Sequence, residues 1–202
     1  MATHKFTMDV DVDRRLSADA RVQYYADFLT DAEQEILYRH LGEGGVVPWR
    51  HGVYNMYGRD VQTPRLLWAM RDDGAEVNAK YKVTDSSPWT PELEAIKVRI
   101  EEKVGRALTY AQLNNYRSGD DYIGWHSDRE LQPGDVIASL SLGCARRFVL
   151  RSKADGTKYE FRLRPGSLLV MNYECAKTEF KHTVPKEPKV REGRINVTFR
   201  NK

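Results

Sequence analysis

The sequence predicts an α+β fold in which two helices pack against a jelly roll made of two β-sheets. Before residue 105, apolar residues recur with helical spacing in two stretches. From about residue 109 onward, polar and apolar residues alternate with a period of two, in short stretches separated by loops that contain Gly and Pro. Helices followed by a run of short strands are typical of an α+β domain built on a double sheet.

The first helix is expected to begin after Thr30 and the second after Thr90. The Thr30 hydroxyl can cap the first helix while Glu33, three residues later, reaches back to the capping residue. Gly42 ends this helix, and Gly105 ends the second, because glycine adopts the backbone conformation that terminates a helix without steric cost. Both helices are interpreted as scaffold.

The chain is expected to form one domain, since its 202 residues lie within the size range of a single core. The polar segment 1–20 is predicted to be loosely ordered or a lone edge strand, and the domain to span 21–202. Within the domain, 49–89 is rich in aromatic and basic residues and is expected to select the substrate, whereas 109–202 forms the jelly-roll core. Six strands are expected in that core, at 111–116, 136–142, 147–151, 159–163, 167–171 and 194–200.

Composition indicates an intracellular protein. The chain contains no apolar run of about 18 residues, as a membrane span requires, and its first ten residues lack the apolar stretch of a secretory signal. Cys144 and Cys175 have no metal-binding or redox spacing, so we expect reduced thiols. We expect a monomer that is nuclear or cytoplasmic.

The net charge of +3 is unevenly distributed. Residues 1–100 carry 13 Lys and Arg against 16 Asp and Glu, whereas residues 101–202 carry 19 against 13. Basic residues of the second half can line a groove that follows phosphates, or they can be ordinary solvated positions. The candidates are Arg146, Arg147, Arg151, Lys153, Lys177, Lys181, Lys186 and Lys189.

A candidate metal site consists of His126, Asp128 and the distant His182. Two imidazoles and one carboxylate can occupy one face of an octahedral Fe(II) ion and leave positions open for a bidentate acid and dioxygen. A structural zinc site would be closed by four ligands. Taken alone, a His-x-Asp pair is more often a surface feature, so the interpretation depends on what accompanies it.

The segment 194–200 supports the interpretation as a metal site, because its polar and apolar residues alternate. In a strand, Arg194 and Arg200 share one face with Asn196 and Thr198, and guanidinium groups bind carboxylates through paired hydrogen bonds. The strand is long compared with a small dianion, so one of the two arginines can act from behind the other ligands. An amphipathic surface strand would show the same alternation.

Taken together in this order and spacing, the motifs resemble the AlkB family of Fe(II)/2-oxoglutarate dioxygenases over roughly residues 50–202. The likeness is strongest to its eukaryotic-type nucleic-acid demethylases. The motifs are Met56-Tyr57-Gly58, Thr63-Pro64-Arg65, Pro88-Trp89, Asn114-Asn115-Tyr116, Trp125-His126-Ser127-Asp128, Ile137 to Gly143, His182 to Lys186 and Arg194 to Arg200.

The resemblance implies a double-stranded β-helix (jelly-roll) core with an N-terminal nucleotide-recognition region. It implies Fe(II) bound by the catalytic residues His126, Asp128 and His182, with 2-oxoglutarate and O2 as co-substrates. The residues expected to bind 2-oxoglutarate are Asn114, Tyr116, Arg194, Asn196, Thr198 and Arg200.

Substrate contacts are expected from Tyr57, Arg65, Tyr81 and Glu130. Related enzymes insert a wedge at the position of Tyr57 and use a carboxylate at the spacing of Glu130 to accept from the amine of the damaged base. For each of these positions an ordinary role is open: core or rim packing for the tyrosines, solvent exposure for Arg65, and an ion pair with an arginine for Glu130. The sequence departs from the family pattern in Arg129, which replaces an acid, and in Val83, which replaces a stacking aromatic.

The function expected from these observations is oxidative demethylation of N-alkylated bases, such as 1-methyladenine and 3-methylcytosine, in DNA or RNA. An oxygenase of the same fold that acts on a protein side chain is the first alternative. A nucleic-acid-binding module with an inert triad, or a zinc hydrolase, is the second.

Overall fold

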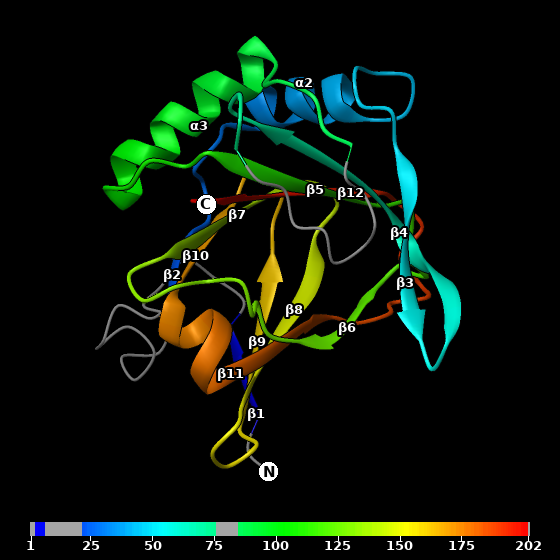
Figure 1. The fold of residues 1–202 in the computed structure, drawn as a ribbon, viewed down its shortest axis with the longest axis vertical. Helices are drawn as coiled ribbons and strands as arrows, with labels where there is room; N and C mark the ends of the chain where they lie inside the picture. The colour runs from blue at the N-terminus through cyan, green and yellow to red at the C-terminus, as the bar shows by residue number, and fades with distance from the viewer. Residues whose placement is uncertain (1–2, 7–21, 76–84, 202) are drawn as a thin grey trace.

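The computed structural model describes residues 3–6, 22–75 and 85–201, and its strands form two sheets (Figure 1). The five-stranded sheet has the order β1 (Thr3–Phe6), β9 (Lys158–Leu163), β8 (Arg146–Ser152), β11 (Phe180–Val184) and β6 (Ile123–His126). The seven-stranded sheet has the order β2 (Val22–Tyr25), β10 (Leu168–Asn172), β7 (Val136–Gly143), β12 (Arg194–Arg200), β5 (Tyr110–Tyr116), β4 (Arg59–Arg71) and β3 (Arg50–Met56). The predicted α+β jelly roll is confirmed.

Helices α2 (Asp31–Leu41) and α3 (Pro91–Val104) begin and end as the sequence predicts. The Thr30 hydroxyl accepts a hydrogen bond from the Glu33 amide at 3.2 Å, and the Glu33 carboxylate accepts one from the Thr30 amide at 2.8 Å. Gly105 ends α3 with a φ of 65°, a conformation that residues with a Cβ rarely adopt. The Thr30 contacts fix the start of α2, and Gly105 fixes the end of α3.

Both helices cover one face of the seven-stranded sheet, and the five-stranded sheet faces its other side (Figure 1). On β12, Ile195, Val197 and Phe199 are at most 1% exposed and belong to the core cluster that also contains Leu37 and Ile100 of the helices. Because side chains alternate along a strand, the polar residues of β12 face the space between the sheets. The alternation at 194–200 therefore reflects a strand that is buried on both faces.

The strands expected at 111–116, 136–142, 147–151, 159–163, 167–171 and 194–200 are all present within a residue or two. The sheets also include strands from before residue 109, namely β1 to β4, so they extend beyond the expected core. Trp68 is 5% exposed on β4 and packs in the core. No helix among the described residues is long and apolar enough to cross a membrane.

Candidate active site

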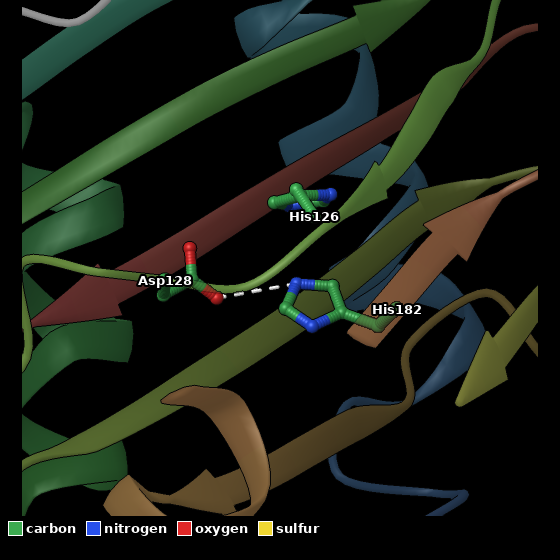
Figure 2. Close-up of side chains that lie close together, drawn as sticks. All are labelled: His126, Asp128 and His182. Carbon is green, nitrogen blue, oxygen red and sulfur yellow. Dashed lines mark ion pairs between the residues drawn. The ribbon is translucent and has the colours of Figure 1, made fainter. Parts of the chain in front are cut away.

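His126, Asp128 and His182 converge between the two sheets (Figure 2). Their candidate ligand atoms all lie within 4.8 Å of one another. His182 Nε2 lies 3.1 Å from Asp128 Oδ2, and the ring centroids of the two histidines are 4.1 Å apart. Two imidazoles and one carboxylate at this spacing can hold an octahedral ion on one face and leave its other positions open.

A β-bulge in β6 turns His126 toward the cavity. His126 is paired with His182 of β11, and Ile123 with Val184, so a step of three residues on β6 faces a step of two on β11. In a regular strand, residues 123 and 126 would point to opposite faces, but both line the cavity here. Bulges commonly redirect a side chain beside an active site, and this one sets the first histidine opposite the second.

Backbone contacts orient the ligands from behind. The His126 Nδ1 atom is 2.9 Å from the carbonyl oxygen of Gly124, an arrangement that leaves Nε2 for a metal ion. The Asp128 amide donates to the carbonyl of Ala176 at 3.0 Å, and the Ser127 hydroxyl donates to the carbonyl of Phe180 at 2.8 Å. Ala176 lies in a π-helix, η2 (Glu174–Glu179), so this rare element holds the loop that carries the carboxylate ligand.

Asp128 is 6% exposed and carries a negative charge in the cavity. Burial alone would raise the pKa of its carboxyl group, but the charges of Arg200 and then His182 outweigh burial and hold that pKa below its ordinary value. Arg200 Nη2 lies 3.2 Å from Asp128 Oδ1. An ionised carboxylate is the form that binds a metal cation, so this environment prepares Asp128 as a ligand.

The wall opposite the triad contains an arginine that the protein leaves partly unsatisfied. Arg194 is 1% exposed, and its Nη2 donates to the Ser141 hydroxyl at 2.8 Å. Its Nε and Nη1 are buried and have no hydrogen-bond partner among the described residues. Burial lowers the pKa of this guanidinium, and the like charge of Arg146 acts in the same direction against an opposing contribution from Tyr116. An unsatisfied buried cation is costly, so the cavity is suited to an anion here.

Strand β5 completes this wall. Asn114 Oδ1 accepts a hydrogen bond from Arg65 Nε at 2.7 Å, which leaves the Asn114 amide nitrogen for a ligand. The Tyr116 ring lies 5.4 Å from the Arg194 guanidinium carbon. Asn114, Tyr116 and Arg194 all line the same cavity as the triad. A carboxylate is the chemical group that an amide N–H, a phenol O–H and a guanidinium bind together.

The remaining polar residues of β12 line the cavity while bonding to neighbouring strands. The Asn196 side-chain nitrogen donates to the Ser139 hydroxyl and to the Leu140 carbonyl, both at 2.9 Å. The Thr198 hydroxyl donates to the Gln112 carbonyl at 2.9 Å. With these donors engaged, direct contact of Asn196 and Thr198 with a small acid stays a prediction.

The residues present fit a metal ion together with a small dianionic keto acid. The triad supplies three ligands on one face, and the unpartnered nitrogens of Arg194 supply buried positive charge in the same cavity. Arg200, which is bonded to Asp128, supports the metal side of the cavity, and Arg194 supplies the anion-binding side. That one of the two arginines acts from behind the other ligands stays a prediction.

Solved structures share this architecture. The chain aligns with a 2OG-Fe(II) oxygenase-family oxidoreductase from Burkholderia pseudomallei with a TM-score of 0.63 and 16% identity, over 100% of this chain and 96% of that one. It aligns with OsALKBH1 with a TM-score of 0.60 and 19% identity, over 90% of this chain and 98% of that one. At these identities the likeness shows the fold.

The sequence comparisons decide the family. Residues 21–200 match the model of the 2OG-Fe(II) oxygenase superfamily. The DNA oxidative demethylase ALKBH2 of Mus musculus is 31% identical over 200 residues, which cover 93% of this chain and 82% of that protein. The chain belongs to the AlkB family of 2OG-Fe(II) oxygenases. The expected Fe(II), 2-oxoglutarate and O2 are thereby confirmed as the cofactor and co-substrates of this AlkB-family chain.

Two further relatives are longer than the matched region. ALKBH2 of Bos taurus is 34% identical over 155 residues, which cover 72% of this chain and 55% of that protein. The alpha-ketoglutarate-dependent dioxygenase alkB homolog 3 of Homo sapiens is 33% identical over 192 residues, which cover 90% of this chain and 66% of that protein. The AlkB-family chain thus spans little more than half of the bovine relative.

The residues expected to contact substrate occupy different places. Tyr57 is 99% exposed at the tip of the β3–β4 hairpin with a φ of 51°, followed by Gly58 at 80°. Arg65 is buried at 3% exposure in the cavity wall, which contradicts the alternative of simple solvent exposure, and its contact with substrate stays a prediction. Glu130 lines the cavity and forms an ion pair with Arg200, the ordinary alternative named for it. Tyr81 and Val83 lie outside the described residues.

The prediction that Arg146 lines a phosphate groove is wrong, because its side chain is fully buried. Its nitrogens donate to Glu187 and to three backbone carbonyls, those of Ser118, Asp121 and Pro185. Its neighbour Arg147 points outward and bonds to Glu160 through two nitrogens, at 2.7 and 3.1 Å. Alternation along β8 explains the difference between the two adjacent arginines.

Sequence reasoning missed several residues of the site. Ser139 and Ser141 of β7 hold Asn196 and Arg194 in place, and a period-two pattern in 137–143 would have indicated their shared face. The Arg65 contact with Asn114 joins residues 49 positions apart, and no local signal predicts it. The π-helix and the bulge of β6 likewise have no pattern in the sequence that marks them.

Proposed function

We propose that this chain oxidatively demethylates N-alkylated bases of the 1-methyladenine and 3-methylcytosine type in DNA or RNA. Formaldehyde is released while 2-oxoglutarate is converted to succinate and CO2. The observation that carries the proposal is the open triad facing a partly unsatisfied Arg194 in one cavity. The curated relatives named DNA oxidative demethylase supply the class of substrate.

The chain's own residues position the reactants. His126, Asp128 and His182 hold Fe(II), which with 2-oxoglutarate and O2 supplies the oxidant that hydroxylates the N-methyl group. Arg194, Tyr116 and the amide of Asn114 bind the acid and keep it oriented toward the triad. The cavity lies between two sheets, so its walls limit the access of water to the reacting groups.

Tyr57 and Glu130 are assigned to the base itself. Tyr57 projects fully exposed from a tight turn, a position from which it can enter a helix beside an extruded base. Glu130 lies in the cavity, forms an ion pair with Arg200, and is assigned to accept from the exocyclic amine of the base. Arg65 and Tyr81 are assigned to the same substrate region. We further propose that the chain acts as a monomer in the nucleus or cytoplasm.

The test is formaldehyde release from a panel of methylated single- and double-stranded DNA and RNA oligonucleotides, with Fe(II), 2-oxoglutarate and O2 supplied. His126→Ala or Asp128→Ala is expected to abolish release. Each substitution removes one of the three protein ligands, and the two that remain are too few to hold the ion in place. The matched control is His40→Ala, which removes a histidine on α2 that pairs with Glu92 outside the cavity. Unchanged turnover in the triad variants, or turnover of a methylated peptide and of no oligonucleotide, contradicts the proposal.

A further inference from the structure

Trp125 is an exposed aromatic on the strand that carries the first metal ligand. It precedes His126 on β6, and the bulge that turns Ile123 and His126 inward leaves Trp125 outside the cavity. Its side chain is 39% exposed, although tryptophan is usually well buried. An exposed tryptophan beside an active site is suited to contact a ligand that passes the entrance.

Cations surround the aromatic residues of this strand. The Arg151 guanidinium carbon lies 4.6 Å from the centroid of the Trp125 ring. Tyr122, which immediately precedes β6, has Lys186 Nζ at 5.0 Å from its ring centroid. Aromatic rings interleaved with basic groups are the combination that proteins use to bind single-stranded nucleic acid, with the rings stacking on bases and the cations meeting phosphates.

A row of like charges crosses the same face of the five-stranded sheet. Lys158 of β9 is paired with Arg151 of β8, and Arg151 with Lys181 of β11. Their neighbours Leu150 and His182 are buried, so by alternation these three cations point to solvent. Like charges directly opposite each other destabilise a sheet, and this arrangement has no ion pair with any carboxylate in the described part of the chain.

Other arginines on the same face of the five-stranded sheet are neutralised by carboxylates, unlike the three cations of the row. Arg147, which lies on the same face four residues before Arg151, is ion-paired with Glu160, and Arg162 is ion-paired with Glu187. Positive charge instead continues from the row toward the loop after Asp128. There, burial lowers the pKa of Lys153, and the charges of Lys181 and Arg129 lower it further. Among the described residues, Arg151, Lys158 and Lys181 therefore form an unpaired row on a face where Arg147 and Arg162 are ion-paired.

We propose that the solvent-facing surface formed by Trp125, Arg151, Lys158 and Lys181 binds single-stranded nucleic acid next to the base held in the cavity. We call this surface the β6 platform. Stacking on Trp125 requires an unpaired base with a free face, which a duplex does not offer, so the platform favours single strands. The role of the platform in catalysis rests on the proposed function. Its binding of nucleic acid does not, because the platform can bind a strand that carries no lesion.

Binding is tested apart from catalysis with a fluorescein-labelled 12-nucleotide oligothymidine that carries no methyl group. Its affinity for the full chain is measured by fluorescence anisotropy at several salt concentrations. Trp125→Ala is expected to weaken binding about tenfold or more, and Trp125→Phe to retain most of it, because a phenyl ring still stacks. Lys158→Gln and Lys181→Gln are each expected to reduce the slope of log K against log salt by about 0.7. Lys103→Gln, on α3 beside Tyr25, is the matched charge control.

Turnover separates this inference from the proposed function. Trp125→Ala is expected to raise KM for a methylated 12-nucleotide strand. If no methylated oligonucleotide is demethylated but Trp125→Ala still weakens oligothymidine binding, the demethylase proposal fails and the platform stands. Equal affinity of Trp125→Ala and the wild type for oligothymidine overturns the platform. Preference for a duplex over the single strand, with the same losses in the variants, overturns it as well.

Discussion

Two buried arginines, Arg146 and Arg194, lie beside the same tyrosine ring, but their nitrogens are satisfied to different extents. The guanidinium carbons of Arg146 and Arg194 lie 5.6 and 5.4 Å from the centroid of the same ring, Tyr116. Arg146 donates to the Glu187 carboxylate and to three backbone carbonyls. Arg194 donates to the Ser141 hydroxyl, while its Nε and Nη1 lack any partner among the described residues.

The difference separates a structural cation from one that awaits a ligand. A buried charge is tolerated when a counter-ion and hydrogen bonds replace water, and Arg146 has both. Arg194 lacks them, so part of its desolvation cost is left uncompensated until an anion arrives. Equal burial therefore gives no indication of role, whereas the number of satisfied nitrogens does.

The largest effect on stability is expected from Arg146→Met. The substitution leaves three backbone carbonyl groups without the Arg146 donor and removes one of the donors to the Glu187 carboxylate, so we expect a loss of about 3–5 kcal/mol in the free energy of unfolding. Urea denaturation followed by circular dichroism measures it. Arg147→Met on the same strand is the control, with an expected loss of about 1 kcal/mol or less, because its pair with Glu160 is partly solvated. Similar losses in both variants would contradict the structural role of Arg146.

Arg194→Met is expected to behave in the opposite way. Replacing an incompletely satisfied buried cation with an apolar side chain should leave stability unchanged or raise it. Affinity for 2-oxoglutarate should fall about 100-fold, since a buried charge-assisted contact with the ligand is lost. Calorimetric titration of 2-oxoglutarate into the anaerobic Mn(II)-loaded chain measures the affinity, and urea denaturation of the metal-free chain measures the stability. A destabilisation as large as that of Arg146→Met would remove the distinction between the two arginines.

The sequence predicted Arg194 well and Arg146 badly, for a physical reason. Arg194 lies in a strand whose alternation is complete, so its face, and with it that of Asn196, Thr198 and Arg200, follows from a period of two. Arg146 precedes a second arginine at the start of β8, and the charge of its side chain was the only indication available, which favoured exposure to solvent. Its burial depends on carbonyls and a carboxylate that lie 25 to 41 residues away in sequence, and local patterns contain no such information.

The same limit applies to the elements around the triad. The helix caps at Thr30 and Thr90 were predictable because a cap is a contact within a few residues. The residue types of the triad and their spacing indicated a metal site. The bulge that turns His126 inward arises from pairing with β11, and the π-helix contact to Asp128 joins segments about 50 residues apart. Contacts of this kind fix the geometry of the site, and only the folded chain shows them.

The smallest of these effects is expected from Glu187→Gln, which keeps the shape of the counter-ion of Arg146 but removes its charge. Burial would raise the pKa of Glu187, but hydrogen bonds from the Arg147 amide and Arg162 outweigh it, and the pKa lies below its ordinary value of 4.5. A lowered carboxyl pKa contributes stability that is present above that ordinary value and is lost as pH falls through the lowered pKa.

Wild type is therefore expected to exceed Glu187→Gln by about 1–2 kcal/mol in the free energy of unfolding at pH 7. The difference should stay constant down to about pH 5 and shrink below 4.5, as the wild-type carboxylate also becomes neutral. Urea denaturation of both proteins from pH 7 to pH 3 follows it. A difference that grows as the pH falls would mean that Glu187 is not held ionised by the arginines around it, and the contrast between Arg146 and Arg194 would then have to rest on the backbone carbonyls alone.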